Sequence, residues 1–123
     1  TKGVKDMTVR ECYGQMGADY ENVLGRLGSE QIVQHFLLKF LNDTSFRDLE
    51  EKLKTKDVEQ AFRAAHSLKG VCLNLGFDNL FAVSSELTEK LRAGELDGTE
   101  ALFEKVKEQY DITVSAIRQL EAS

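Results

Sequence analysis

Proline is absent from the 123 residues of this chain. Because proline interrupts helices and is common in stiff linkers, its absence favours long helices and argues against a proline-rich linker. The sequence also lacks any long run of alternating β-branched residues, which argues against a β-sandwich or a β-barrel. A chain of this length has room for one compact domain, which excludes a multidomain kinase. The composition therefore predicts a single all-α domain.

Positive charge is in deficit, and long apolar stretches are missing. The chain has 16 lysine and arginine residues against 21 aspartate and glutamate residues, a net charge of −5, so its field repels nucleic acids and acidic membranes. Unbroken apolar stretches such as 36–38 and 71–73 are three residues long. A membrane span needs roughly 20 apolar residues. We expect a cytoplasmic protein with no nucleic-acid partner and no membrane partner.

Cysteine is scarce. Cys12 and Cys72 lie far apart, without a CxxC motif or any spacing typical of a metal site. Two such cysteines are more often free thiols than a disulfide. We therefore expect two free thiols, no metal site and no cofactor bound by this chain.

Hydrophobic periodicity indicates four long amphipathic helices after a short lead-in. Residues 7–27 predict one or two short helical pieces, because glycines interrupt them. Residues 30–55 are treated as one bundle member, with a polar cluster at 42–45 that either kinks the helix or restarts it.

The most regular apolar stripe occupies residues 58–75, which Asp57 caps and Gly76 ends. Asp78 is expected to cap the next helix, and the last helix begins near Thr99. Four such helices with short connections predict an antiparallel up-down-up-down four-helix bundle with a short N-terminal helical lead-in.

We divide the chain after residue 17. Residues 1–17 are the lead-in, either a short helix or a cloning remnant followed by a helix, and residues 18–123 are the bundle domain. No long apolar face is left over, so we expect a monomer.

One histidine stands out by its neighbours. His66 lies about 100° around its helix from Ala65, the centre of the apolar stripe, and therefore at an edge that water reaches. Lys69 follows on the same side, so its stem can lie on apolar surface while its ammonium reaches towards the imidazole. Gly70 is one turn beyond His66, where a glycine costs about 1 kcal/mol against alanine. With no side chain at Gly70, a bulky partner can approach the imidazole.

These three residues suit phosphoryl transfer. A neutral imidazole is a nucleophile, and Lys69 would stabilise charge on the phosphoryl oxygens. Neither a GxxxxGK[ST] nor a GxGxxG motif occurs, so we expect no ATP site and no autokinase activity. We expect a phosphohistidine carrier, and whether it counts as an enzyme stays open. Any divalent ion would come with the partner.

The stretch Ala65-His66-Ser67-Leu68-Lys69-Gly70, with a glycine stop at Gly76, resembles the A-H-x-L-K-G signature of histidine-containing phosphotransfer (HPt) domains. The similarity of overall pattern covers about residues 18–121. It implies a phosphorelay intermediate that accepts a phosphoryl group on His66 from a receiver-domain aspartate and passes it to another. It also implies that Nε2 of His66 attacks, that Lys69 stabilises charge and that Gly70 gives clearance.

The same resemblance implies response-regulator receiver domains as partners and leaves a sensor histidine kinase open as another. Some members of the family place a glutamine near the histidine on the following helix, a position that counting assigns to Thr88, which we therefore expect to help bind the partner. Helical geometry adds four outward positions near His66 as a receiver-docking face. These are Glu59, Arg63, Ser67 and Asn74.

Other hypotheses compete with this one. The chain could be the His-bearing phosphotransfer module of a larger hybrid or chemotaxis-type kinase, with another donor, or a non-catalytic helical adaptor. Gly70 could instead mark a close approach between helices. A ferritin-type metal bundle is disfavoured, because the positions three before the two histidines are Ile32 and Arg63, so no Glu-x-x-His pair exists. His35 lacks a similar lysine and glycine and is interpreted as structural or solvated.

Overall fold

A computed structural model describes residues 6–123. In this part of the chain it contains seven α-helices and no β-strand, which confirms the predicted all-α fold. The cloning remnant considered for the first residues lies outside the described residues. None of the helices described is long and apolar enough to cross a membrane. The helices are α1 (Val9–Met16), α2 (Tyr20–Leu27), α3 (Glu30–Phe40), α4 (Ser45–Lys54), α5 (Val58–Leu75), α6 (Asp78–Arg92) and α7 (Thr99–Ala122).

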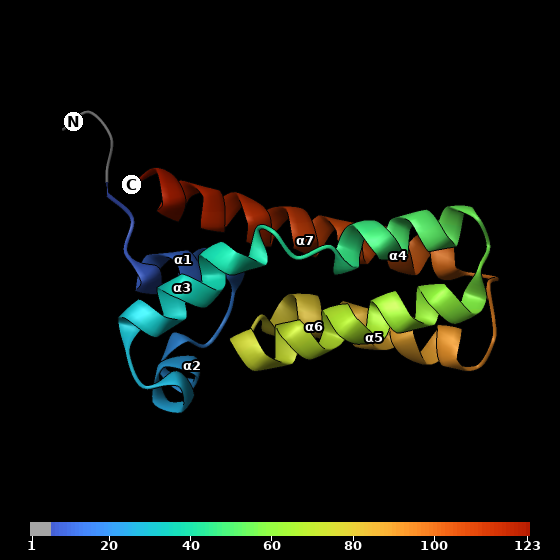
Figure 1. The fold of residues 1–123 in the computed structure, drawn as a ribbon, viewed down its shortest axis with the longest axis horizontal. Helices are drawn as coiled ribbons and strands as arrows, with labels where there is room; N and C mark the ends of the chain where they lie inside the picture. The colour runs from blue at the N-terminus through green and yellow to red at the C-terminus, as the bar shows by residue number, and fades with distance from the viewer. Residues whose placement is uncertain (1–5) are drawn as a thin grey trace.

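The long helices pack side by side around one apolar core. Helix α5 lies between α4 and α6, and α7 packs against both α6 and α1 (Figure 1). Stacked aromatic rings join α4 to α7, because Phe46 lies 4.0 Å from Tyr110 and 5.3 Å from Phe103 between ring centroids. Helices α1, α2 and α3 gather at one end of the molecule (Figure 1).

Residues 30–55, treated as one bundle member, form two helices, and of the two alternatives for the polar cluster at 42–45 the restart is confirmed. Helix α3 ends at Phe40, and α4 starts afresh at Ser45. The Asp43 carboxylate accepts a hydrogen bond of 2.8 Å from the Ser45 amide, and the Thr44 hydroxyl donates to Asp48 at 3.1 Å. Side chains of this kind compete with the helix for backbone groups, so the polar cluster restarts the helix rather than kinking it.

Helix α5 follows its sequence pattern from end to end. The Asp57 carboxylate accepts from the Gln60 amide at 3.1 Å, and Gly76 ends the helix with a φ of 71°. A side-chain carbon at Gly76 would collide with Val23 of α2. Helix α6 differs from the prediction at its start, because Asp78 is its first helical residue and Phe77 occupies the N-cap position without a capping side chain.

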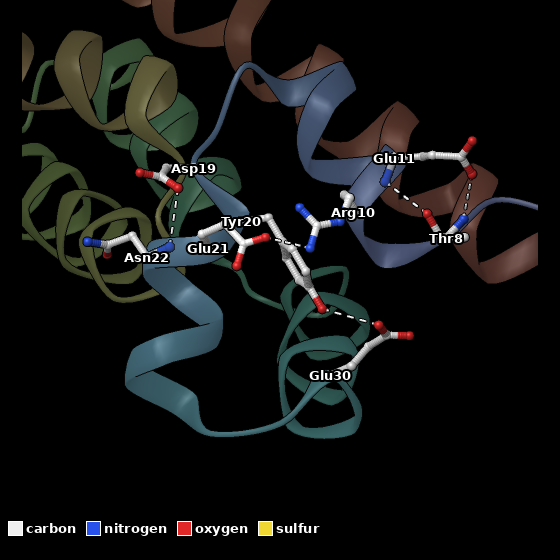
Figure 2. Close-up of polar contacts among 8 residues, drawn as sticks. All are labelled: Thr8, Arg10, Glu11, Asp19, Tyr20, Glu21, Asn22 and Glu30. Atoms are coloured by element: carbon white, nitrogen blue, oxygen red, sulfur yellow. Dashed lines mark hydrogen bonds and ion pairs between the residues drawn. The ribbon is translucent and has the colours of Figure 1, made fainter.

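The N-terminal helices are tied to each other and to α3 by polar contacts (Figure 2). Thr8 and Glu11 form a capping box at the start of α1. Arg10 of α1 pairs with Glu21 of α2, and the Tyr20 hydroxyl donates to Glu30 of α3 at 3.2 Å (Figure 2). The helical pieces predicted for residues 7–27 are therefore two helices, α1 and α2, that pack together.

Candidate functional site

His66 lies on the exposed surface of α5, as the helical angle predicted. Its ring packs beside Phe62 one turn earlier on the same helix, with 5.8 Å between the ring centroids and 40° between the planes. Ala65 beside it is fully buried, so the helix is anchored in the core while the imidazole faces solvent. The imidazole is therefore open to a partner molecule.

Lys69 connects α5 to α6 through its ammonium group. Its side chain is only 26% exposed, and its ammonium lies 3.9 Å from a carboxylate oxygen of Glu89 on α6. Most of the side chain is thus withdrawn from solvent and its ammonium faces Glu89, while the predicted reach of the ammonium towards the imidazole stays a prediction. The contact with Glu89 was not predicted, because it depends on how α6 is rotated against α5.

Glu89 links Lys69 to a second cation, Arg92, which contacts the aromatic neighbour of His66. The other carboxylate oxygen of Glu89 accepts a hydrogen bond of 3.0 Å from Arg92 Nε. The Arg92 guanidinium in turn lies over the ring of Phe62, 4.9 Å from its centroid. We call these five residues the site cluster. Its members are Phe62, His66, Lys69, Glu89 and Arg92.

Gly70 has no structural need to be glycine. A side-chain carbon built at this position would meet no atom within 4 Å, apart from the two residues adjacent to Gly70 in the sequence and the backbone of its own helix. The alternative that Gly70 marks a close approach between helices is therefore wrong. The position stays helical, so an alanine would gain helix propensity at no steric cost. Open space one turn from His66 is what an approaching partner requires.

The four outward positions predicted on α5 are all exposed. Glu59 and Arg63 form an exposed ion pair at 3.4 Å. Arg63 and Ser67 line a hollow of about 210 Å³ between α4 and α5. Asn74 lies at the other end of the helix, where it lines a larger groove of about 640 Å³. The structure places these residues along the helix that carries His66.

The larger groove runs from α5 to α3. Val71 and Asn74 line it from α5, and Phe36 and Lys39 line it from α3. Phe36 is 38% exposed. Near the same end of α5, Leu73 is 58% exposed. Exposed apolar side chains at this end of the helix that carries His66 are suited to contact with another protein.

The docking role predicted for Thr88 is contradicted. Thr88 is fully buried, and its hydroxyl donates to the Ser84 carbonyl at 2.6 Å. One residue along an α-helix is a rotation of about 100°, which turns Thr88 towards the core and Glu89 towards the site. The glutamate, rather than the threonine, is the α6 residue that reaches Lys69.

The two cysteines are free, as predicted, and both are buried. Burial raises the pKa of the Cys12 thiol to about 11. Burial also raises the pKa of Cys72, with a smaller contribution from the Asp43 charge. Within residues 6–123, no group of three or more His, Cys, Asp or Glu side chains is arranged to hold a metal ion.

Comparison with known proteins gives one match. A protein-family model described as Hpt domain matches residues 31–120, a range that contains every member of the site cluster. No curated protein and no solved structure shows significant similarity to the chain.

Proposed function

The chain belongs to the Hpt domain family, whose members act in histidine phosphotransfer, and on that premise we propose that His66 is the residue that carries the phosphoryl group. The observation that carries the proposal is the exposed imidazole of His66 with open space above Gly70. The other histidine, His35, lies on α3 with its ring against Phe36, 5.4 Å between centroids, and has no comparable lysine or glycine.

The proposed reaction is a reversible exchange between a histidine and an aspartate. Nε2 of His66 attacks the phosphorus of an aspartyl phosphate on a receiver domain, and the Nδ1 proton of the imidazole passes to solvent. A nitrogen–phosphorus bond forms while the bond between phosphorus and the carboxylate oxygen breaks, so the receiver aspartate leaves as a carboxylate. The same steps in reverse pass the group to the aspartate of a second receiver.

Lys69 is proposed to stabilise the charge of the phosphoryl oxygens during both steps. An ammonium on a partly buried stem presents a positive charge without large reorganisation. The divalent ion belongs to the receiver in this proposal. Gly70 supplies the clearance that an in-line approach of the receiver needs.

The docking face extends along α5. Glu59, Arg63, Ser67 and Asn74 are exposed on the helix that carries His66. We add the groove lined by Phe36 and Val71, because it adjoins this face and exposes apolar surface. A receiver domain that covers His66 would contact both regions. A sensor histidine kinase is a further candidate partner.

A two-step transfer assay tests the relay. The chain is incubated with a labelled, phosphorylated receiver, separated from it, and then mixed with a second receiver. The relay predicts that label enters the chain in the first step and leaves in the second. ATP alone should give no label. Absence of uptake from a panel of receivers would favour a helical adaptor, and uptake only from an ATP-bound kinase domain would favour a kinase module.

A further inference from the structure

Glu89 stands between two cations at the edge of the site. One carboxylate oxygen lies 3.0 Å from Arg92 Nε, and the other lies 3.9 Å from Lys69 Nζ. The first distance is that of a hydrogen bond, whereas the second exceeds the usual range of about 2.7–3.2 Å. Arg92 therefore fixes the carboxylate, and Lys69 is the loosely held partner.

We propose that Glu89 competes with the phosphoryl group for the Lys69 ammonium and thereby lowers the stability of phosphorylated His66. The inference rests on the proposed function of His66 and Lys69. In the unphosphorylated chain, the carboxylate keeps Lys69 near the site and balances its charge. When the phosphoryl group arrives, the ammonium turns from Glu89 to the phosphoryl oxygens.

The contact between Lys69 and Glu89 places the carboxylate near any phosphoryl group that Lys69 binds. If Lys69 Nζ stays in place and donates to a phosphoryl oxygen, that oxygen lies at most about 7 Å from the Glu89 carboxylate. Like charges at this separation repel each other, but only weakly, because the Glu89 side chain is 55% exposed and water screens the pair. Glu89 thus opposes the phosphorylated state mainly by holding Lys69.

The position of Glu89 also suits a carrier that must release its phosphoryl group. A phosphohistidine that is too stable would not pass its group on. Arg92 keeps the carboxylate in position through its contacts with Glu89 and with the Phe62 ring. Glu89 is therefore a positioning residue, which acts through Lys69 rather than on the reacting atoms.

The test compares Glu89→Gln with the wild-type chain in equilibrium with one phosphorylated receiver. The glutamine oxygen can still accept from Arg92, but the charge is gone. We expect the ratio of phosphorylated to unphosphorylated chain to rise about two- to fivefold, the range of an exposed charge pair. The difference should shrink as salt is added.

Glu86→Gln is the matched control. Glu86 is an exposed glutamate one turn earlier on α6, and it forms no ion pair with any residue in the described range 6–123. It should change the ratio much less than Glu89→Gln. In a Lys69→Ala background, most of the Glu89→Gln effect should disappear, because the competition needs the ammonium.

The possible outcomes distinguish a failure of the role proposed for His66 from a failure of the role proposed for Glu89. A wild-type chain that takes up no label on His66 overturns the proposed function. A labelled wild type whose ratio is unchanged by Glu89→Gln, or changed equally by Glu86→Gln, overturns the role of Glu89 alone. An effect that keeps its full size without Lys69 contradicts the competition.

Discussion

The Tyr13 hydroxyl of α1 donates a hydrogen bond of 2.7 Å to the Leu75 carbonyl at the end of α5. Both groups are buried. Arg26 of α2 adds a bond of 3.1 Å from Nη1 to the Asn74 carbonyl. The last carbonyls of a helix have no partner within the helix, so α1 and α2 complete the end of the helix that carries His66.

Tyr13→Phe should therefore lower the free energy of unfolding by about 1–3 kcal/mol, because it leaves a buried carbonyl without a donor. Chemical denaturation measures this change. Tyr110→Phe is the control, since no hydrogen bond from the Tyr110 hydroxyl to residues 6–123 is present. Equal losses in the two variants would show that the bond to Leu75 does not stabilise the fold.

Substitutions at Gly70 should separate stability from transfer. Gly70→Ala is expected to raise the free energy of unfolding by about 0.5–1 kcal/mol, since the site has room for the side chain. Gly70→Gln should also fold, but its side chain should obstruct the receiver and slow transfer at least about tenfold, which corresponds to about 1.4 kcal/mol of lost transition-state stabilisation.

Gly25→Ala is the matched control for Gly70, because Gly25 is also helical and its added carbon would also meet no atom within 4 Å. It should stabilise the chain and leave the transfer rate unchanged. Normal transfer by Gly70→Gln would remove the clearance role.

Lys69→Ala should slow transfer and lower the yield of phosphohistidine while the fold persists. The long contact with Glu89 contributes little to stability, so the free energy of unfolding should change by less than about 1 kcal/mol. Transfer kinetics from a phosphorylated receiver measure the loss. Lys105→Ala removes an exposed lysine of α7 as a control. Kinetics like those of the control would exclude an electrostatic role for Lys69.

The buried thiols should resist alkylation. A Cys12 pKa raised from 9.0 to about 11 leaves about 100-fold less thiolate at pH 8, and the thiolate is the form that reacts. Cys72 should behave in the same way, because its pKa is also raised. Alkylation with iodoacetamide should thus be slow in the native chain and fast after denaturation. Rapid native alkylation at either cysteine would contradict the burial.

The sequence predicted what depends on local interactions. Helix α5 and its two ends follow from a capping carboxylate at Asp57 and a glycine with positive φ at Gly76. The exposed edge at His66 follows from helical periodicity, because Ala65 lies at the centre of the buried stripe.

The features that the sequence did not predict depend on how the helices pack. Whether Thr88 or Glu89 reaches Lys69 is decided by the rotation of α6 against α5, and one residue changes that direction by about 100°. Only the packed structure shows that Glu89 bridges Lys69 and Arg92. The division of the chain after residue 17 stays a prediction.

The central claim is that His66 carries the phosphoryl group, and the most direct measurement maps phosphorylation onto the two histidines. Wild type, His66→Gln and His35→Gln are each incubated with a phosphorylated receiver and analysed by intact mass at alkaline pH, with circular dichroism to check the fold. The account predicts one acid-labile phosphoryl group on wild type and on His35→Gln, and none on a folded His66→Gln. Phosphorylation of His66→Gln, or its loss in His35→Gln alone, would contradict it.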